Sequence, residues 1–301
     1  MDCLSDLECS LNRQVIGQPV ACEKITKAIL RAEIGPPRPG NKPKGSFLLL
    51  GPTGVGKTSL VLSLLNVLYN SNKGNFLRLD MAEFQTQDAL ASLLGEDRKA
   101  QGILGNSLDI INSNGGGIIL FDEVEKAHKN VIKILLSILD EGHVTVNNLE
   151  KKYFNNVYLF FTSNLGCSKI INANQLPESG TKKIMETAAQ EFFGPELLAR
   201  FKQIITFSPL SLKNQITILR QAMKSELLLW EKKLNLNIQV DEKSVIPLII
   251  KEIPSKRLGA RPFLTKVEEL LGDALVQFKL KRIEKNILIK GENNKIICLS
   301  M

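Results

Sequence analysis

A glycine-rich segment in the first quarter of the chain constrains the fold more than any other feature. The segment Gly51–Thr58 fits the pattern G-x-x-x-x-G-K-[ST] of a phosphate-binding loop, or P-loop. The apolar run Ser46–Leu50 precedes it, as expected of a strand buried on both faces of a parallel sheet. Thr58–Leu68 follows and carries apolar residues all around the helical period, as a buried helix does. This order predicts an α/β fold that binds a nucleotide phosphate.

The residue types in the loop match the chemistry of phosphate binding. Backbone N–H groups at a helix N-terminus form a nest for phosphate oxygens, and glycines let the backbone approach without Cβ clashes. Lys57 can bridge the outer phosphates, and the Thr58 hydroxyl can hold Mg²⁺. We therefore predict that the nucleotide contacts are Gly51, Pro52, Thr53, Gly54, Val55, Gly56, Lys57 and Thr58.

A second apolar run, Gly117–Phe121, ends in two carboxylates, Asp122 and Glu123. Acidic residues at the carboxyl end of a buried parallel strand lie at the edge where such sheets bind ligands. Beside a P-loop, Asp122 is expected to hold Mg²⁺ through its water shell. Glu123 is expected to orient or deprotonate the water that attacks the γ-phosphate. Without the P-loop, the same run would indicate only a strand that enters a solvated loop.

A third strand candidate, Val157–Phe161, runs into Thr162, Ser163 and Asn164. A neutral amide at this position can hydrogen-bond the γ-phosphate or the attacking water without adding negative charge. A Ser-Asn turn at a strand end is common and is the alternative explanation. The repeated pattern of a polar residue after each strand favours a role for Asn164 in the site.

Composition excludes several classes of protein. The apolar runs are much shorter than the roughly 20 residues needed to cross a bilayer, and Met1–Asp6 carries no secretion signal. The five cysteines are scattered, with no pair at C-x-x-C spacing, which is typical of reduced thiols rather than of a zinc site. We expect a cytoplasmic protein with no membrane partner.

The charge balance leaves a nucleic-acid partner open. The 39 Lys and Arg residues exceed the 31 Asp and Glu residues and give a formal net charge of +8. Net positive charge favours binding to nucleic acid. However, the two signs alternate along the chain, and the densest basic cluster, Lys279–Lys285, contains Glu284. No helix-turn-helix or other DNA-binding module is evident.

Six segments, taken in order, resemble one known family, the Clp/ClpB-type AAA+ ATPases. The match runs almost end to end and is to the second ATPase module of the members that form two rings. The P-loop segment and the acidic segment are nearly identical to the family patterns. The six segments are Val15–Gln18, Gly45–Thr58, Leu120–His128, Phe161–Gly166, Gly194–Phe201 and Leu258–Pro262.

The resemblance implies roles for further residues, with ATP and Mg²⁺ as the bound groups. Ile16 lies in the box that flanks adenine, and Asn164 is the family's sensor 1. Arg261 is its sensor 2, a cation from the same subunit, while Arg200 is the arginine finger that the neighbouring subunit supplies. Each fixed cation lowers the barrier, since negative charge spreads over the transferred phosphoryl group. A finger supplied in trans implies a closed homo-oligomeric ring, with a hexamer expected.

Two domains are expected. Residues 1–208 alternate strand and helix patterns and predict a three-layer α/β/α AAA+ core. Residues 209–301 predict a small α+β lid domain that carries Arg261. Its expected elements are a long helix over Leu210–Lys232, a second helix from Pro262 to Lys281, strands at Leu236–Val240, Asn286–Lys290 and Lys295–Ser300, and a hairpin turn at Glu292–Asn294.

The chain departs from the family where substrate-threading members present an aromatic residue to the ring pore. If Gly102–Gly105 is the equivalent segment, Ile103 takes the aromatic position; with a different alignment, charged residues do. No Tyr, Trp or Phe lies between Phe84 and Phe121. An aromatic side chain grips a polypeptide through a large rigid face, and isoleucine grips more weakly.

Other family parts are also missing. From the short segment before Val15 we expect no N-terminal substrate domain and no first ATPase ring. The segment between Gly166 and Thr181 lacks the apolar-Gly-apolar tripeptide that docks a peptidase ring, so no peptidase partner is expected.

Three functions follow as hypotheses. The first is a Clp-type ATPase that remodels or disassembles a protein partner, recognised directly or through an adaptor. The second is a DNA-associated AAA+ ATPase, such as a loader or a transposition helper. The third is an assembly switch that uses ATP to recruit partners without threading a chain.

Overall fold

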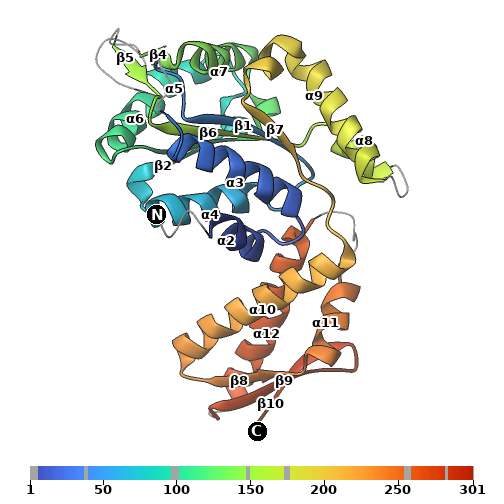
Figure 1. Cartoon of the computed structure of the whole chain (residues 1–301). Helices are drawn as coiled ribbons and strands as arrows, with labels where there is room; N and C mark the ends of the chain where they lie inside the picture. The colour runs from blue at the N-terminus through green and yellow to red at the C-terminus, as the bar shows by residue number, and fades with distance from the viewer. Residues whose placement is uncertain are drawn as a thin grey trace. The chain divides into compact units, whose positions relative to one another are not determined.

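The computed structural model describes residues 6–36, 40–95, 102–146, 150–172, 177–253, 259–281 and 284–300 (Figure 1). The chain divides into two compact units. One comprises Met1–Pro52 and Gly56–Ser208, and the other comprises Thr53–Val55 and Pro209–Met301. Each unit has a sheet and a core of its own.

A five-stranded parallel sheet forms the centre of the first unit. Its strand order is β2-β3-β6-β1-β7. Every residue of β1, β3 and β6 is buried, as their continuous apolar runs predict. The strands are β1 (Gly45–Leu50), β2 (Phe76–Asp80), β3 (Gly117–Asp122), β6 (Val157–Ser163) and β7 (Gln203–Thr206).

Helices cover both faces of this sheet. Figure 1 shows α2, α3 and α4 on one face and α5, α7 and α9 on the other, which confirms the predicted three-layer α/β/α core. Among the described residues, none of the helices is long and apolar enough to cross a membrane. The helices of this unit are α2 (Leu7–Gln14), α3 (Pro19–Glu33), α4 (Lys57–Tyr69), α5 (Ala89–Leu94), α6 (Ile103–Ser113), α7 (Lys129–Glu141), α8 (Cys167–Asn172) and α9 (Glu178–Arg200), with short 3₁₀ turns η1 (Lys73–Asn75), η2 (Met81–Phe84) and η3 (Val124–Lys126).

Strand β6 supplies aromatic side chains to both faces of the central sheet. Phe160 stacks on Phe47 with ring centroids 4.9 Å apart, and its neighbour Phe161 stacks on Phe121 at 4.7 Å. Phe201 meets Phe161 edge to face at 5.1 Å. Because successive strand residues face opposite sides, the consecutive residues Phe160 and Phe161 pack on opposite faces of the sheet. This burial holds β6 rigidly between the strands that end at the P-loop and at the acidic pair.

A small hairpin, β4 (His143–Thr145) with β5 (Lys151–Tyr153), lies outside the central sheet. Lys152 is buried and donates from Nζ to both carboxylate oxygens of Asp109 on α6, at 2.8 Å each.

Helix α6 begins at Ile103, the residue predicted at the pore position, and 45% of Ile103 is exposed. The charged residues of the alternative alignment, 96–99, lie outside the described residues.

The second unit is a three-stranded sheet packed against helices. Strand β9 (Asn286–Glu292) lies between β8 (Asn237–Val240), to which it is parallel, and β10 (Lys295–Ser300), to which it is antiparallel. Helices α10 (Leu212–Leu234) and α12 (Arg261–Lys281) match the two predicted helices. The β9–β10 turn has φ values of 49° at Asn293 and 60° at Asn294, the left-handed pair that a two-residue hairpin requires.

One helix of this unit is not anticipated by the sequence analysis. Helix α11 (Glu242–Lys251) follows β8 directly and carries Pro247 inside it. The signal for its start is present, because the Asp241 side chain accepts a hydrogen bond from the Lys243 N–H at 3.2 Å and caps the helix. The internal proline obscures the periodic pattern that would identify the rest of the helix.

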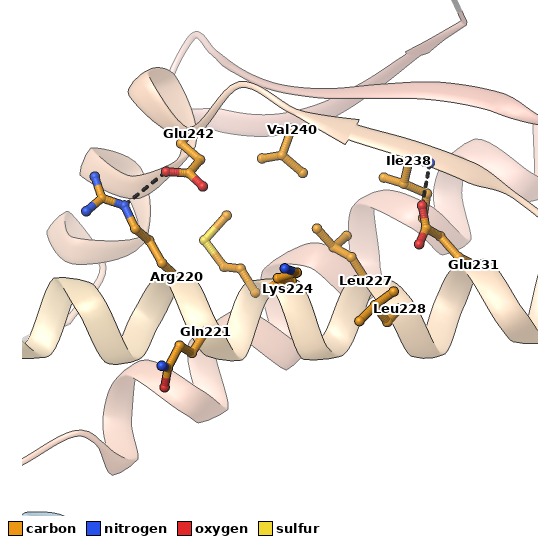
Figure 2. A pocket seen from close by; sticks show the side chains of 10 residues that line it. Arg220, Gln221, Lys224, Leu227, Leu228, Glu231, Ile238, Val240 and Glu242 are labelled. Carbon is orange, nitrogen blue, oxygen red and sulfur yellow. Dashed lines mark hydrogen bonds and ion pairs between the residues drawn. The ribbon is translucent and has the colours of Figure 1, made fainter. Parts of the chain in front are cut away.

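Helix α10 and strand β8 border a pocket in this unit (Figure 2). Charged side chains at its two ends have partners within this unit. Arg220 Nε lies 2.9 Å from Glu242 Oε2, and the Ile238 N–H donates to Glu231 Oε1 at 2.9 Å. No residue of the predicted nucleotide site lines this pocket.

The four described cysteines are free thiols. Cys22 and Cys167 are buried, and burial raises the pKa of each to about 11. Both thiols are therefore protonated at neutral pH.

The aromatic packing of β6 gives a stability prediction. Substitution Phe161→Ala leaves a cavity between Phe121 and Phe201, and we expect the free energy of unfolding to fall by about 3–5 kcal/mol. Urea denaturation followed by circular dichroism measures the change. The matched control is Phe192→Ala, because Phe192 is 44% exposed and should cost about 1 kcal/mol or less. Equal losses in the two variants would contradict the assignment of Phe161 to the core.

Candidate nucleotide-binding site

Three parallel strands end side by side and gather the predicted site residues. In the order β3-β6-β1, each strand is a neighbour of the next, so their carboxyl ends lie at one edge of the sheet. Asp122 and Glu123 come at the end of β3, Asn164 directly follows β6, and Gly51 directly follows β1. The Gly51 N–H donates to the Ser163 carbonyl at 3.1 Å, which joins the P-loop to the end of β6.

The P-loop takes the backbone shape that its glycines allow. Gly54 has φ 74° and Gly56 has φ 105°, and α4 starts at the next residue, Lys57. Gly51 is required for a different reason. A methyl group at Gly51 would lie 2.7 Å from Cβ of Phe207 and 2.9 Å from its carbonyl oxygen, so the loop packs directly on the chain after β7.

Lys57 is buried, with 7% of its surface exposed. Its Nζ donates to the carbonyl oxygens of Gly51 and Pro52, the latter at 2.8 Å, and to Asn164 Oδ1 at 2.8 Å. Burial lowers the pKa of Lys57 to about 8, although nearby carboxylates favour the charged form. The ammonium group therefore contacts its own loop and loses its proton at a lower pH than an ordinary lysine does.

The Asn164 side chain connects the lysine to the predicted general base. Its Oδ1 accepts from Lys57, and its Nδ2 donates to Glu123 Oε1 at 2.9 Å. The Asn164 N–H donates to Glu125 Oε1 at 2.9 Å, which fixes the start of the loop after β6. One amide thus bridges a cation and a carboxylate, with both of its polar atoms used.

Glu123 has a constrained backbone. Its φ of 56° is in the left-handed region, which is uncommon for a residue with a Cβ and costs about 1–3 kcal/mol. Its N–H donates to Thr162 Oγ1 at 2.9 Å, and its carboxylate pairs with Lys126 as well as with Asn164. Such strain, held by surrounding hydrogen bonds, is typical of functional positions.

Both carboxylate oxygens of Asp122 have partners. Oδ1 accepts from the Thr162 hydroxyl, and Oδ2 lies 2.6 Å from Arg78 Nη2. Arg78 comes from β2, where Asp80 pairs in register with Asp122. Asp122 is therefore held by two elements on opposite sides of β3.

These residues fit Mg²⁺ bound largely through water and phosphate. Thr58 lies in the first turn of α4, and Asp122 is a single buried carboxylate at the same sheet edge. In the part of the chain that the structure describes, no group of three or more His, Cys, Asp or Glu residues could hold a metal ion. A hydroxyl, one carboxylate and substrate phosphates are the sparse ligand set that Mg²⁺ uses in nucleotide sites.

The segment that contains Ile16 lies beside the P-loop. Val15 is buried, and its Cγ1 lies 3.0 Å from the position that a Cβ on Gly56 would take. The Gln18 amide donates to the Ser208 carbonyl at 2.8 Å and accepts from the Ser208 N–H at 3.1 Å. This double hydrogen bond holds the half-buried Ile16 in place near the loop.

The two predicted arginines differ in their relation to the P-loop: the Ala260 N–H, next to Arg261, donates to the Gly54 carbonyl at 2.7 Å, whereas Arg200 pairs elsewhere. Arg200 is the last residue of α9, and its Nη1 pairs with Asp140 Oδ1 at 2.5 Å rather than with a P-loop residue. Arg261 is exposed at the start of α12 in the second unit. Their roles in the site stay predictions. His128, at the end of the acidic segment, caps α7 by accepting from the Asn130 N–H at 3.3 Å.

Three residues of the site are not anticipated by the sequence analysis. Thr162 and Glu125 lie within segments that it identified, but their contacts depend on how two loops meet. Arg78 reaches Asp122 across 44 residues of sequence, and only the pairing of β2 with β3 would reveal it.

Comparison with known proteins agrees with this geometry. The family described as AAA domain (Cdc48 subfamily) matches residues 42–204, which include β1, the P-loop, β3 and β6. The chain belongs to this family. Its match covers the strands and loops that bring Lys57, Asn164 and Glu123 together.

The relatives at sequence level are ClpB chaperones. The chaperone protein ClpB of Staphylococcus aureus strain COL is 33% identical over 288 residues, which is 92% of this chain and 32% of that protein. ClpB of Mycoplasmoides gallisepticum is 34% identical over 287 residues, 93% of this chain and 38% of that protein. The chain therefore spans about one third of the length of these relatives.

A solved structure extends the likeness to both units. A closed-state cryo-EM reconstruction of Hsp104 with ATPγS and FITC-casein superposes with a TM-score of 0.86 at 27% identity. The match covers 99% of this chain and 52% of that chain. The chain thus matches Clp/ClpB-type AAA+ modules across both of its units, and the family assignment implies a nucleotide-binding core.

The lowered pKa of Lys57 predicts how nucleotide binding depends on pH. The free protein loses the Lys57 proton as pH rises through about 8, whereas a bound triphosphate keeps the lysine charged. ATP affinity should therefore fall from pH 7.5 to 9.5, by up to about tenfold per pH unit above 8. Calorimetric titration at several pH values measures this.

The control is Lys57→Arg, because a guanidinium stays protonated throughout this range. Its affinity for ATP will differ from that of the wild type, but it should lose the pH dependence. The same slope in both proteins would show that another group titrates.

Proposed function

We propose that the chain hydrolyses Mg-ATP within a homo-oligomeric ring and uses the energy to remodel a protein partner. The hydrogen-bonded chain Lys57–Asn164–Glu123 carries this proposal, because it joins a phosphate-binding cation to a candidate general base. The relatives named ClpB chaperone, and the Hsp104 reconstruction with ATPγS, support the assignment of substrate and reaction.

Binding begins at the P-loop. The triphosphate accepts hydrogen bonds from backbone N–H groups between Thr53 and Thr58, and Lys57 turns from the loop carbonyls to the outer phosphate oxygens. Thr58 and Asp122 would hold Mg²⁺, which neutralises charge on the β- and γ-phosphates. Ile16 packs against the adenine base from the adjoining segment.

Hydrolysis then uses the residues at the ends of β3 and β6. Once Lys57 binds phosphate, Asn164 Oδ1 loses its donor and the side chain is free to turn, so that Nδ2 donates to the γ-phosphate or Oδ1 accepts from the attacking water. Glu123 accepts a proton from that water or aligns it for attack. Asn164 is neutral, so it directs the water without repelling the anionic phosphate.

The two arginines supply positive charge to the transition state. Arg261 would do so within the subunit, and Arg200 would act on the nucleotide of the neighbouring subunit. Arg200 has 40% of its side chain exposed at the end of α9, as a residue used between subunits must have. Hydrolysis would then require assembly, with a hexameric ring as the proposed state.

The exposed Ile103 bears on how the ring would act on a protein. It is the first residue of α6 and offers a smaller apolar face than the aromatic residues expected of threading rings. This observation favours a weaker grip on one dedicated partner, or an assembly switch that does not thread a chain. A DNA-associated role has only the net charge of +8 in its favour.

Substitution Glu123→Gln tests whether Glu123 acts as the general base in ATP hydrolysis. The isosteric amide keeps the Asn164 contact but cannot take a proton, so we expect ATP affinity to be retained and turnover to fall by about 10²-fold or more. Steady-state ATPase assays and nucleotide titration separate the two effects. Normal turnover in this variant would falsify the assignment of Glu123 as the base.

The same variant, held with ATP, distinguishes the kinds of partner. Protein remodelling predicts capture of fluorescent casein, an unfolded-protein probe, with an affinity that depends little on salt. Binding of duplex DNA that weakens steeply with salt would favour the nucleic-acid function. Assembly with ATP but no capture of casein would favour the switch.

Mixing two inactive variants tests whether Arg200 acts in trans. Arg200→Ala and Glu123→Gln should each be nearly inactive alone, but a mixture should regain part of the activity. In mixed rings, an intact Glu123 in one subunit meets an intact Arg200 from its neighbour. ATPase activity measured over a range of ratios checks this, and lack of rescue at every ratio argues against a finger in trans.

A further inference from the structure

The guanidinium of Arg200 is held along one edge by a second helix. Arg200 Nη1 lies 2.5 Å from Oδ1 of Asp140, near the end of α7. The Asp140 side chain is 25% exposed, so the carboxylate is partly shielded from water where it meets the arginine. Helices α7 and α9 pack against each other, which brings the two residues together.

The other edge of the same guanidinium is open. Within the described ranges, the ionic partner of Nη2 is Glu196, at 3.9 Å, and the Glu196 side chain is 75% exposed. Among the residues that the structure describes, no group hydrogen-bonds Nε. A guanidinium has five N–H donors in a rigid fork, so one edge bound to Asp140 leaves a second edge free for an anion.

The backbone beneath this side chain is also anchored. Gly194, with φ 74°, interrupts α9, so Arg200 ends a short separate turn that begins at Pro195. The Lys202 N–H donates to both the carbonyl and the hydroxyl of Ser46, at 3.0 Å each. Ser46 belongs to β1, the strand that enters the P-loop, so the position of Arg200 is tied to the sheet.

We propose that Asp140 is a positioning residue for Arg200. By holding one edge of the guanidinium, it restricts a long flexible side chain to an orientation whose free edge projects outward, toward the triphosphate of a neighbouring copy. This inference rests on the proposed role of Arg200 in hydrolysis. Because the arginine is ordered before the neighbour arrives, less conformational entropy is lost when it engages phosphate.

A purely structural role for the pair predicts a different result. Ion pairs between half-exposed side chains contribute little to the stability of a fold. Loss of Asp140 should therefore leave the folded protein and its nucleotide affinity intact. The effect should appear in turnover, and only where Arg200 is present.

The experiment substitutes Asp140 and measures ATPase kinetics of the full chain. Asp140→Ala should lower kcat on the order of tenfold, because a misplaced catalytic group acts poorly, while KM for ATP stays within about twofold. Asp140→Asn keeps an acceptor without the charge and should fall between Asp140→Ala and the wild type. Glu141→Gln is the control, since Glu141 neighbours Asp140 in sequence but pairs with His143 at 3.3 Å; it should keep nearly normal turnover.

Mixed rings provide a measurement that would not change if Asp140 only stabilised the fold. In the mixture of Arg200→Ala with Glu123→Gln subunits, the Glu123→Gln subunit supplies the arginine. Adding Asp140→Ala to that subunit should reduce the rescued activity on the order of tenfold, as in the single variant. Adding Asp140→Ala to the Arg200→Ala subunit should change nothing.

Distinct outcomes separate the two hypotheses. If Arg200→Ala abolishes turnover but Asp140→Ala does not reduce it, the positioning role is wrong and the proposed role of Arg200 stands. An equal loss on adding Asp140→Ala to either subunit of the mixture also overturns positioning. If Arg200→Ala itself turns over normally, the proposed function of Arg200 fails and the role of Asp140 fails with it. If no mixture is rescued at any ratio, the finger in trans fails, and the positioning of Arg200 toward a neighbouring copy fails with it.

Discussion

One buried ammonium group holds the candidate site together. Lys57 Nζ contacts two carbonyls of its own loop and the amide of Asn164, and that amide contacts Glu123. A cation that is 7% exposed would be costly without such partners, and burial lowers the pKa of Lys57 even with them. A triphosphate supplies a better set of partners. Its arrival would therefore rearrange the lysine, the amide and the carboxylate together.

The sheet makes this arrangement possible. Because β3, β6 and β1 are parallel neighbours, three segments distant in sequence end within hydrogen-bonding reach of one another. Aromatic side chains of β6 pack on both faces and fix that strand between the other two. The geometry of the polar site thus depends on apolar packing several residues away from it.

The sequence predicts the fold well and the site in part, for identifiable reasons. Continuous apolar runs followed by Gly51, Asp122 and Asn164 indicate both the strands and their polar ends, because burial on two faces leaves little choice of residue. Arg78 and Asp140 could not be found in this way. Each is an ordinary charged residue in its own segment and becomes informative only when a neighbouring strand or helix brings it to its partner.

The left-handed backbone at Glu123 has a consequence for reading genetic variation at this position. Side chains branched at Cβ fit that conformation poorly, whereas glycine and asparagine accept it. The residue at this position must therefore both adopt a left-handed backbone conformation and carry a carboxylate. Variants lost from a population at this site need not all be defective in chemistry, because some would fail to form the turn.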